Sequence, residues 1–191
     1  MASKEYKCVQ KTKRTFQSAI VELSKEQPLN KVSVKQVCER AEMSRNAFYF
    51  HYEDINSLIK EVEDTMIGEI NSMFIELREI AFPDNVLVVI EKLTDYFINN
   101  RDATLMLTDS TYSTSFTKRI DKEFSDFFFE YYKQFNPKGS KQIFDFFYGF
   151  VSNGFCGMLI QWLHNPEGVS KRHFIRLAYT FVHKLLVGSG N

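Results

Sequence analysis

One stretch of the 191-residue chain decides its fold, Val32-Ser-Val-Lys-Gln-Val-Cys-Glu-Arg-Ala-Glu-Met-Ser-Arg-Asn-Ala-Phe-Tyr-Phe-His-Tyr-Glu-Asp-Ile-Asn-Ser-Leu58. Ser33 stands three residues before Gln36, which is the Ser-x-x-Gln spacing of a capping box, so a helix is predicted to begin at the residue after Ser33. Ser44 is a second capping residue and predicts a short helix over residues 45–52. Two short helices separated by a tight turn are typical of a helix-turn-helix.

Helical spacing continues on both sides of this stretch. Apolar residues recur at steps of three and four, and no segment alternates with the period of two that a half-buried strand shows. A preceding helix over residues 6–25 places Phe16, Ile20 and Leu23 on one face. Asp54 caps a long fourth helix, and further helices are predicted over residues 86–98, near 106, and over 116–135, 141–164 and 170–187, with a loop at 109–115. The chain is therefore expected to be all-α, with about nine helices.

Charge is divided unevenly along the chain although its formal net charge is zero. Residues 1–52 hold ten Lys or Arg against five Glu, a net charge of +5, and the remaining 139 residues carry −5. A basic first quarter predicts that only this part meets a polyanion such as nucleic acid, although the same residues could merely solvate helix faces. We expect two domains, a helix-turn-helix DNA-binding domain over residues 1–53 and a larger helical body over residues 54–191.

The third helix carries the side chains suited to reading bases. Arg45 can grip guanine O6 and N7, and Asn46 can pair with adenine N6 and N7. Tyr49 and His51 are suited to phosphate oxygens, which position a protein without reading sequence. A plain helical hairpin with polar surface residues remains an alternative. The full predicted DNA-binding set is Ser33, Lys35, Gln36, Ser44, Arg45, Asn46, Ala47, Tyr49 and His51.

The quoted stretch resembles the signature of the tetracycline-repressor (TetR) family of bacterial transcription regulators. The resemblance covers about residues 10–60 and rests on matching positions in one joint pattern, namely Ser33, Ala41, Ser44, Tyr49, His51, Tyr52 and Leu58. The chain departs from the family pattern in two places. Glu42 stands where the family usually has Gly, so the turn needs a geometry that a non-glycine residue tolerates. Ile55 replaces a frequent phosphate-contacting Lys, a role that Lys60 or the first-helix lysines could take instead.

The resemblance also implies a homodimer in which the last two long helices of each subunit form a four-helix bundle. The helix over residues 141–164 agrees, since it is apolar almost all round, and its glycines permit close helix approach. These residues could instead belong only to the core of a single chain. The predicted interface residues are Phe150, Gly154, Gly157, Met158, Trp162, Phe174, Ala178, Phe181 and Leu185.

The resemblance further implies a ligand pocket among the middle helices. Aromatic residues crowd the helix over residues 116–135, and a small apolar or aromatic effector would suit them, although such stripes also form ordinary cores. The candidate pocket residues are Phe74, Tyr96, Phe97, Met106, Phe128, Tyr132 and Phe147. An effector-responsive repressor, released by its ligand from a palindromic DNA operator, is the function expected. An adaptor or coactivator of the same fold, acting through a protein partner, is the alternative.

Other classes of protein fit less well. The four histidines are scattered, and there is no His-Glu-x-x-His, Gly-rich phosphate loop or nucleophile elbow, so we expect neither an enzyme nor a metal or cofactor site. The three cysteines form no Cys-x-x-Cys pair, and no leader with an apolar core stands near the amino terminus. Charge is expected to interrupt every apolar stretch well before the ~20 residues of a bilayer crossing. A cytoplasmic protein without a membrane span is therefore expected.

Overall fold

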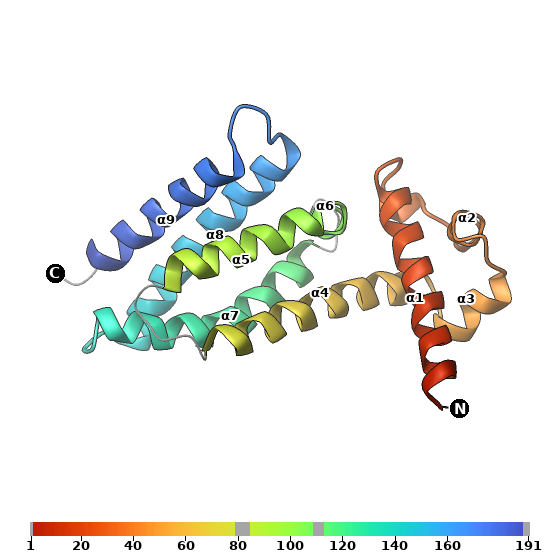
Figure 1. Cartoon of the computed structure of the whole chain (residues 1–191), viewed down its shortest axis with the longest axis horizontal. Coiled ribbons are helices and arrows are strands. Elements are labelled where there is room, and N and C mark those ends of the chain that lie inside the picture. Colours follow the sequence, from red (N-terminus) through yellow and green to blue (C-terminus); the bar gives the residue numbers. More distant parts are fainter. Residues whose placement is uncertain (1, 79–84, 109–112, 189–191) are drawn as a thin grey trace. The chain divides into compact units, whose positions relative to one another are not determined.

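The computed structural model describes residues 2–78, 85–108 and 113–188. Over these residues the chain forms nine α-helices, one 3₁₀ helix at Leu29–Lys31 and no strand, so the all-α prediction is confirmed (Figure 1). The α-helices are α1 Ala2–Ser24, α2 Val34–Arg40, α3 Arg45–His51, α4 Ile55–Arg78, α5 Asn85–Asn99, α6 Arg101–Thr108, α7 Ser113–Phe135, α8 Lys141–His164 and α9 Lys171–Gly188.

The structure differs from the sequence prediction at the starts of α1 and α7 and in one additional 3₁₀ turn. α1 begins at residue 2 instead of 6, because Ala, Lys and Glu in its first turn favour the helical state. The 3₁₀ turn was not predicted; it follows Pro28, whose φ of −57° suits such a turn, and it buries Leu29. α7 begins at residue 113, so the end of the predicted loop is helical. Residues 109–112 of that loop lie outside the described residues, as does the predicted end of the fourth helix near Pro83.

The chain divides into two compact units. The first comprises Met1–Met66 and Asp102–Ser113, and the second comprises Ile67–Arg101 and Thr114–Asn191. The domain boundary proposed after residue 53 follows the helix-turn-helix pattern. The division into compact units, in contrast, falls within α4, with residues 55–66 in the first unit and residues 67–78 in the second.

The core of the first unit is built around three aromatic rings. Phe16 of α1 lies edge-on to Phe48 of α3, with ring centroids 5.4 Å apart, and the ring of Tyr52 lies 6.0 Å from that of Phe16. α2 adds Val37, which has no exposed surface. Edge-to-face pairs of buried rings contribute about 0.5–1.5 kcal/mol beyond the burial of their area. Because these side chains hold one face of α3 inward, its opposite face is left on the surface of the unit.

Aromatic side chains also hold the second unit together. Phe74 of α4 packs against Phe124 and Phe127 of α7, at centroid distances of 4.4 and 4.6 Å. α7 meets α8 where the ring of Tyr132 lies 5.4 Å from that of Phe144. α5 and α9 pack along each other (Figure 1). The second unit is thus a helical body with an aromatic interior.

The long apolar sequence of α8 contradicts the expectation that charge interrupts every apolar stretch well before the ~20 residues of a bilayer crossing. By length and composition this 24-residue helix could cross a membrane, since its most apolar 18-residue window has a mean hydropathy of 1.4. Between Asp145 and the terminal His164 its polar residues are Tyr148, Ser152, Asn153 and Gln161, none of which is charged. Only 11% of that window is buried inside the single chain. α8 therefore offers a large apolar surface for contacts outside its own chain.

Candidate nucleic-acid interface

The capping box predicted at the start of α2 is present. The Gln36 backbone N–H donates to Ser33 Oγ at 3.3 Å, and the Ser33 backbone N–H donates to Gln36 Oε1 at 2.9 Å. Two backbone donors that the helix cannot satisfy itself are thereby satisfied, which sets where α2 begins. Lys35 lies exposed in the first turn and pairs with Glu39 one turn later at 3.7 Å.

Glu42 ends α2 in a left-handed conformation, with a φ of +52°. Its backbone N–H donates to the Glu39 carbonyl at 3.2 Å, and that of Met43 donates to the Cys38 carbonyl at 2.9 Å. These two bonds form a Schellman motif, in which glycine normally occupies the left-handed position. The Glu side chain is accommodated because it points into solvent. The departure from the family pattern therefore costs conformational energy at one residue and leaves the turn intact.

Replacing Glu42 with Gly should stabilise the protein by about 0.5–1 kcal/mol, since glycine removes the left-handed penalty but loses more freedom on folding. For a chain of this size we expect the thermal midpoint to rise by about 1–4 °C, as followed by circular dichroism. Ser18→Gly, at an exposed position inside α1, serves as the control and should lower it. A lower midpoint for Glu42→Gly would contradict this account.

α3 has one buried and one exposed face. Ser44 caps it, because the Ala47 backbone N–H donates to Ser44 Oγ at 3.1 Å. Phe48 and Tyr52 hold its inner face, with 0% and 4% exposure. The outer face presents four exposed side chains, which are those of Arg45, Asn46, Tyr49 and Phe50. This arrangement places hydrogen-bonding groups and one cation on the outer surface of the first unit, which is called the head from here on. A bound molecule can contact them there.

The nine predicted DNA-binding residues all lie on α2, on α3 or at their caps. Ser33, Lys35, Ser44, Arg45, Asn46 and Tyr49 are exposed, and Gln36, Ala47 and His51 are partly exposed. Arg45 makes no ion pair within the described residues, whereas Arg40 donates to Glu26 at 2.8 Å and to Glu22 at 3.4 Å. The charge of Arg45 is therefore free to meet a polyanion, and that of Arg40 is compensated inside the head.

A partly buried polar network lies behind α3, and no pattern in the sequence predicted it. Lys13 Nζ donates to Glu61 Oε1 at 2.5 Å, Gln17 Nε2 donates to Glu61 Oε2 at 3.3 Å, and the Tyr52 hydroxyl donates to Glu61 Oε2. A buried Tyr needs a hydrogen-bond partner for its hydroxyl, and this requirement is the signal in the sequence that could have indicated the network. Lys13 and Lys60, suggested as phosphate ligands, are both ion-paired, Lys60 with Asp64 at 2.7 Å.

The network shifts two pKa values in opposite directions. Burial alone would raise the pKa of the Glu61 carboxyl, but the hydrogen bonds from Lys13 and Tyr52 and the Lys13 charge outweigh burial and lower it. Burial, followed by the bond to Glu61, raises the pKa of Tyr52. Glu61 is therefore held ionised and Tyr52 neutral in the folded head.

Because Glu61 has a lowered pKa in the folded state, its contribution is present above its ordinary pKa and is lost as the pH falls through the lowered value. We expect the wild type to lose stability between about pH 5 and 3 and Glu61→Gln to lose less over the same interval. Urea unfolding midpoints at both pH values test this. Glu53→Gln, at an exposed carboxylate, is the matched control, and equal pH dependence in Glu61→Gln and wild type would refute the role of Glu61.

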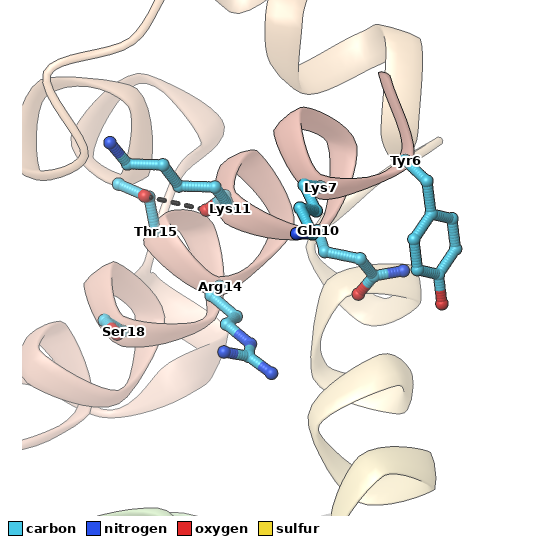
Figure 2. A pocket seen from close by; sticks show the side chains of 7 residues that line it. All are labelled: Tyr6, Lys7, Gln10, Lys11, Arg14, Thr15 and Ser18. Atoms are coloured by element: carbon cyan, nitrogen blue, oxygen red, sulfur yellow. Dashed lines mark hydrogen bonds between the residues drawn. The ribbon is translucent and has the colours of Figure 1, made fainter. Parts of the chain in front are cut away.

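The outer face of α1 carries further free cations. Lys7, Lys11 and Arg14 stand at steps of four and three, so they share one side of the helix, and they line a shallow hollow with their polar neighbours Tyr6, Gln10, Thr15 and Ser18 (Figure 2). All three cations are exposed and make no ion pair within the described residues. They form a positive stripe on the same unit as α2 and α3.

The predicted effector residues are mostly packed against one another. Phe74, Phe97 and Tyr132 are buried, and Tyr96, Phe128 and Phe147 are partly exposed. Tyr96 donates to Glu69 at 2.9 Å, and the ring of Phe147 lies 5.5 Å from that of Tyr132. Met106 is buried in the first unit, whereas the other six belong to the second. The shallow hollow on α1 belongs to the first unit, as does a second one around the α2–α3 turn, which is lined by Lys35, Cys38, Glu39, Glu42, Met43 and Arg45.

The predicted dimer residues fall into two groups. Phe150, Gly154, Gly157, Phe181 and Leu185 are exposed, and Met158 and Trp162 are partly exposed. Phe174 and Ala178 are buried inside the single chain, because the ring of Phe174 stacks on that of Trp162 at 4.8 Å. These two side chains therefore offer little surface to a partner. Ile143 and Phe146, which are 56% and 73% exposed, extend the same side of α8 and were missed, although their helical spacing from Phe150 was visible.

Comparisons with known families match both parts of the chain. The sequence model described as bacterial regulatory proteins of the tetR family matches residues 18–62. The model described as the C-terminal region of a transcriptional regulator matches residues 84–184, which is more than half of the chain. No curated protein shows a significant match.

Solved structures share the fold over nearly the full length. A putative TetR-family regulator from Syntrophomonas wolfei superposes with a TM-score of 0.74 at 13% identity, covering 94% of this chain and 96% of that one. A TetR regulator from Streptococcus agalactiae gives 0.63 at 23% identity, with coverages of 95% and 99%. The fatty acid degradation regulator FadR from Bacillus halodurans gives 0.71 at 10%, with coverages of 92% and 98%. The chain therefore belongs to the TetR family of transcriptional regulators.

Proposed function

We propose that this regulator is a homodimeric repressor that binds a palindromic DNA operator through α2 and α3 and is released by a small apolar or aromatic ligand. The observation that carries the proposal is the outer face of α3, where Arg45 and Asn46 are exposed and Arg45 has no acidic partner among the described residues. A guanidinium and an amide on one helix face match the acceptors and donors that guanine and adenine present in the major groove.

The remaining residues of the head supply contacts that position the protein. Tyr49 is 58% exposed, and its hydroxyl can donate to a phosphate oxygen, as can the ring of His51. Ser33 caps α2, whose first backbone N–H groups favour an anion. Arg45 and Asn46 are thus assigned to base recognition, and the other side chains to the register on the duplex.

The positive stripe of Lys7, Lys11 and Arg14 replaces the phosphate contact that Ile55 cannot make. Each phosphate contact that is lost lowers the salt dependence of binding by about one unit of slope. Replacing all three residues with Ala removes up to three contacts in each subunit of the dimer, so it should weaken binding to all duplexes alike and reduce the slope by about five units. Anisotropy titrations across a salt series measure this, and Lys25→Ala, at a cation already paired with Asp102 at 2.9 Å, is the control. An unchanged slope in the triple variant would contradict the assignment.

The exposed side of α8 is proposed to pack against a second copy of the chain. Ile143, Phe146 and Phe150 recur at steps of three and four, and Gly154 and Gly157 have open space above them. Phe181 and Leu185 of α9 are 49% and 39% exposed. Large apolar side chains exposed in this number mark an interaction site, and a two-fold partner brings the same surface to it. The second copy would cover the apolar side of α8, so no membrane is needed to bury it.

Release by a ligand is proposed to act through α4. The aromatic layer of α7 and α8 includes Phe128, whose ring lies 6.2 Å from Phe74 of α4. An apolar ligand that inserted among these rings would favour one arrangement of α4, whose first half belongs to the unit of the reading head. A ligand that binds without changing operator affinity would refute this coupling.

The test of the function is fluorescence anisotropy of the purified protein with labelled DNA from beside its own gene and a scrambled duplex as competitor. We expect binding that survives the competitor at physiological salt and weakens as salt rises. Binding equal to that of scrambled DNA, together with recovery of a stoichiometric protein partner, would instead support the adaptor. The departure from the family pattern at Glu42 gives no support to the adaptor, because the turn keeps its Schellman geometry.

A further inference from the structure

Phe50 is the most exposed large apolar side chain among the residues whose surroundings the structure describes, with 79% of its surface exposed. It lies in the last turn of α3, four residues after Asn46, so the two side chains share one side of the helix. Its ring meets that of His51 edge-on at a centroid distance of 4.9 Å. An apolar ring thus lies exposed on the helix that carries Arg45 and Asn46.

The neighbours of Phe50 indicate what it meets. The exposed rings of α8, such as Phe146 and Phe150, lie among other apolar side chains, as expected of a protein interface. Phe50 instead shares its side of α3 with the amide of Asn46, and the other exposed side chains of this helix are the cation of Arg45 and the phenol of Tyr49. A single apolar contact surrounded by hydrogen-bonding groups matches the major groove, where the thymine C5-methyl is the one apolar group beside base-edge donors and acceptors.

We infer that Phe50 packs on the C5-methyl of a thymine in each half-site and so selects thymine over cytosine at that position. The inference rests on the proposed DNA-binding function. Phe50 adds shape-based recognition of a methyl group to the hydrogen bonds of Arg45 and Asn46. Burial of one methyl is worth about 0.8 kcal/mol, which corresponds to about fourfold in affinity per half-site.

The test replaces thymine with deoxyuridine, which lacks only the methyl. A duplex enriched by the wild-type protein from a random 30-base-pair pool is resynthesised with each thymine replaced in turn, symmetrically in both half-sites. We expect one position at which the wild type loses about fourfold per half-site. Phe50→Ala should bind the thymine duplex more weakly by a similar factor and should not distinguish it from the deoxyuridine duplex. Phe50→Leu should keep part of the preference.

The outcomes separate this inference from the function on which it rests. If the wild type enriches no duplex, DNA recognition itself fails, and the role of Phe50 fails with it. A second outcome is that the wild type binds its duplex, but the losses in affinity caused by Phe50→Ala and by deoxyuridine are independent at every position. This outcome contradicts only the thymine contact. Thermal melting monitors the fold of both variants, which should match the wild type because Phe50 lies outside the core.

Discussion

Arg45→Ala is expected to weaken operator binding by about 30-fold or more while leaving the fold unchanged. A bidentate contact to guanine is worth about 1–3 kcal/mol, and a dimer makes it twice, so the loss is about 2–6 kcal/mol. Arg45 is exposed and makes no ion pair within the described residues, so its removal breaks no contact that holds the head together. Competition anisotropy with operator and scrambled duplexes measures the loss.

Two further variants make this result specific. Arg40→Ala removes the same charge from the same head, but Arg40 is already compensated by Glu22 and Glu26, so operator affinity should change little. Arg45→Lys keeps the charge without the planar fork, so it should retain non-specific binding and lose preference for the operator. Equal losses in Arg40→Ala and Arg45→Ala would mean that Arg45 contributes only general charge, contrary to base recognition.

Replacing Phe150 and Phe181 together with Glu is expected to give a folded monomer. Each Phe buried between two copies contributes about 1.5–3 kcal/mol, and the two-fold contact counts each residue twice, so the dimer dissociation constant should rise more than 1000-fold. In the single chain Phe150 is 70% exposed and Phe181 49%, so the substitution leaves the protomer core intact. Sedimentation at micromolar concentration measures the mass, and circular dichroism measures the helix content.

Tyr6→Glu is the control, because it introduces a charge at an aromatic residue that is 66% exposed on α1, outside this surface. It should sediment as the wild type does. The monomeric variant should also lose operator affinity, since one head binds only one half-site. A wild type that sediments as one subunit, or a double variant that remains dimeric, would refute the α8–α9 interface.

Local signals in the sequence were sufficient to predict the helices of the head. Ser33 and Ser44 set the starts of α2 and α3 through side chains that reach only three residues ahead, and such short-range bonds can be read from spacing alone. Helical periodicity likewise placed Phe16, Ile20 and Leu23 on one face, and all three are buried. The same periodicity does not show that Phe174 and Ala178 are buried within the single chain, since a stripe does not tell whether its own chain or a second copy covers it.

The sequence alone therefore determined the all-α class, the order of the helices and the face of α3 that turns outward, because each depends on residues a few positions apart. Tertiary structure alone decided which charges are free. Lys13 is ion-paired with Glu61, 48 residues away, whereas Lys7, Lys11 and Arg14 make no ion pair within the described residues. Ion pairs between distant segments depend on how helices pack, and helical spacing carries no information about partners brought together only by folding.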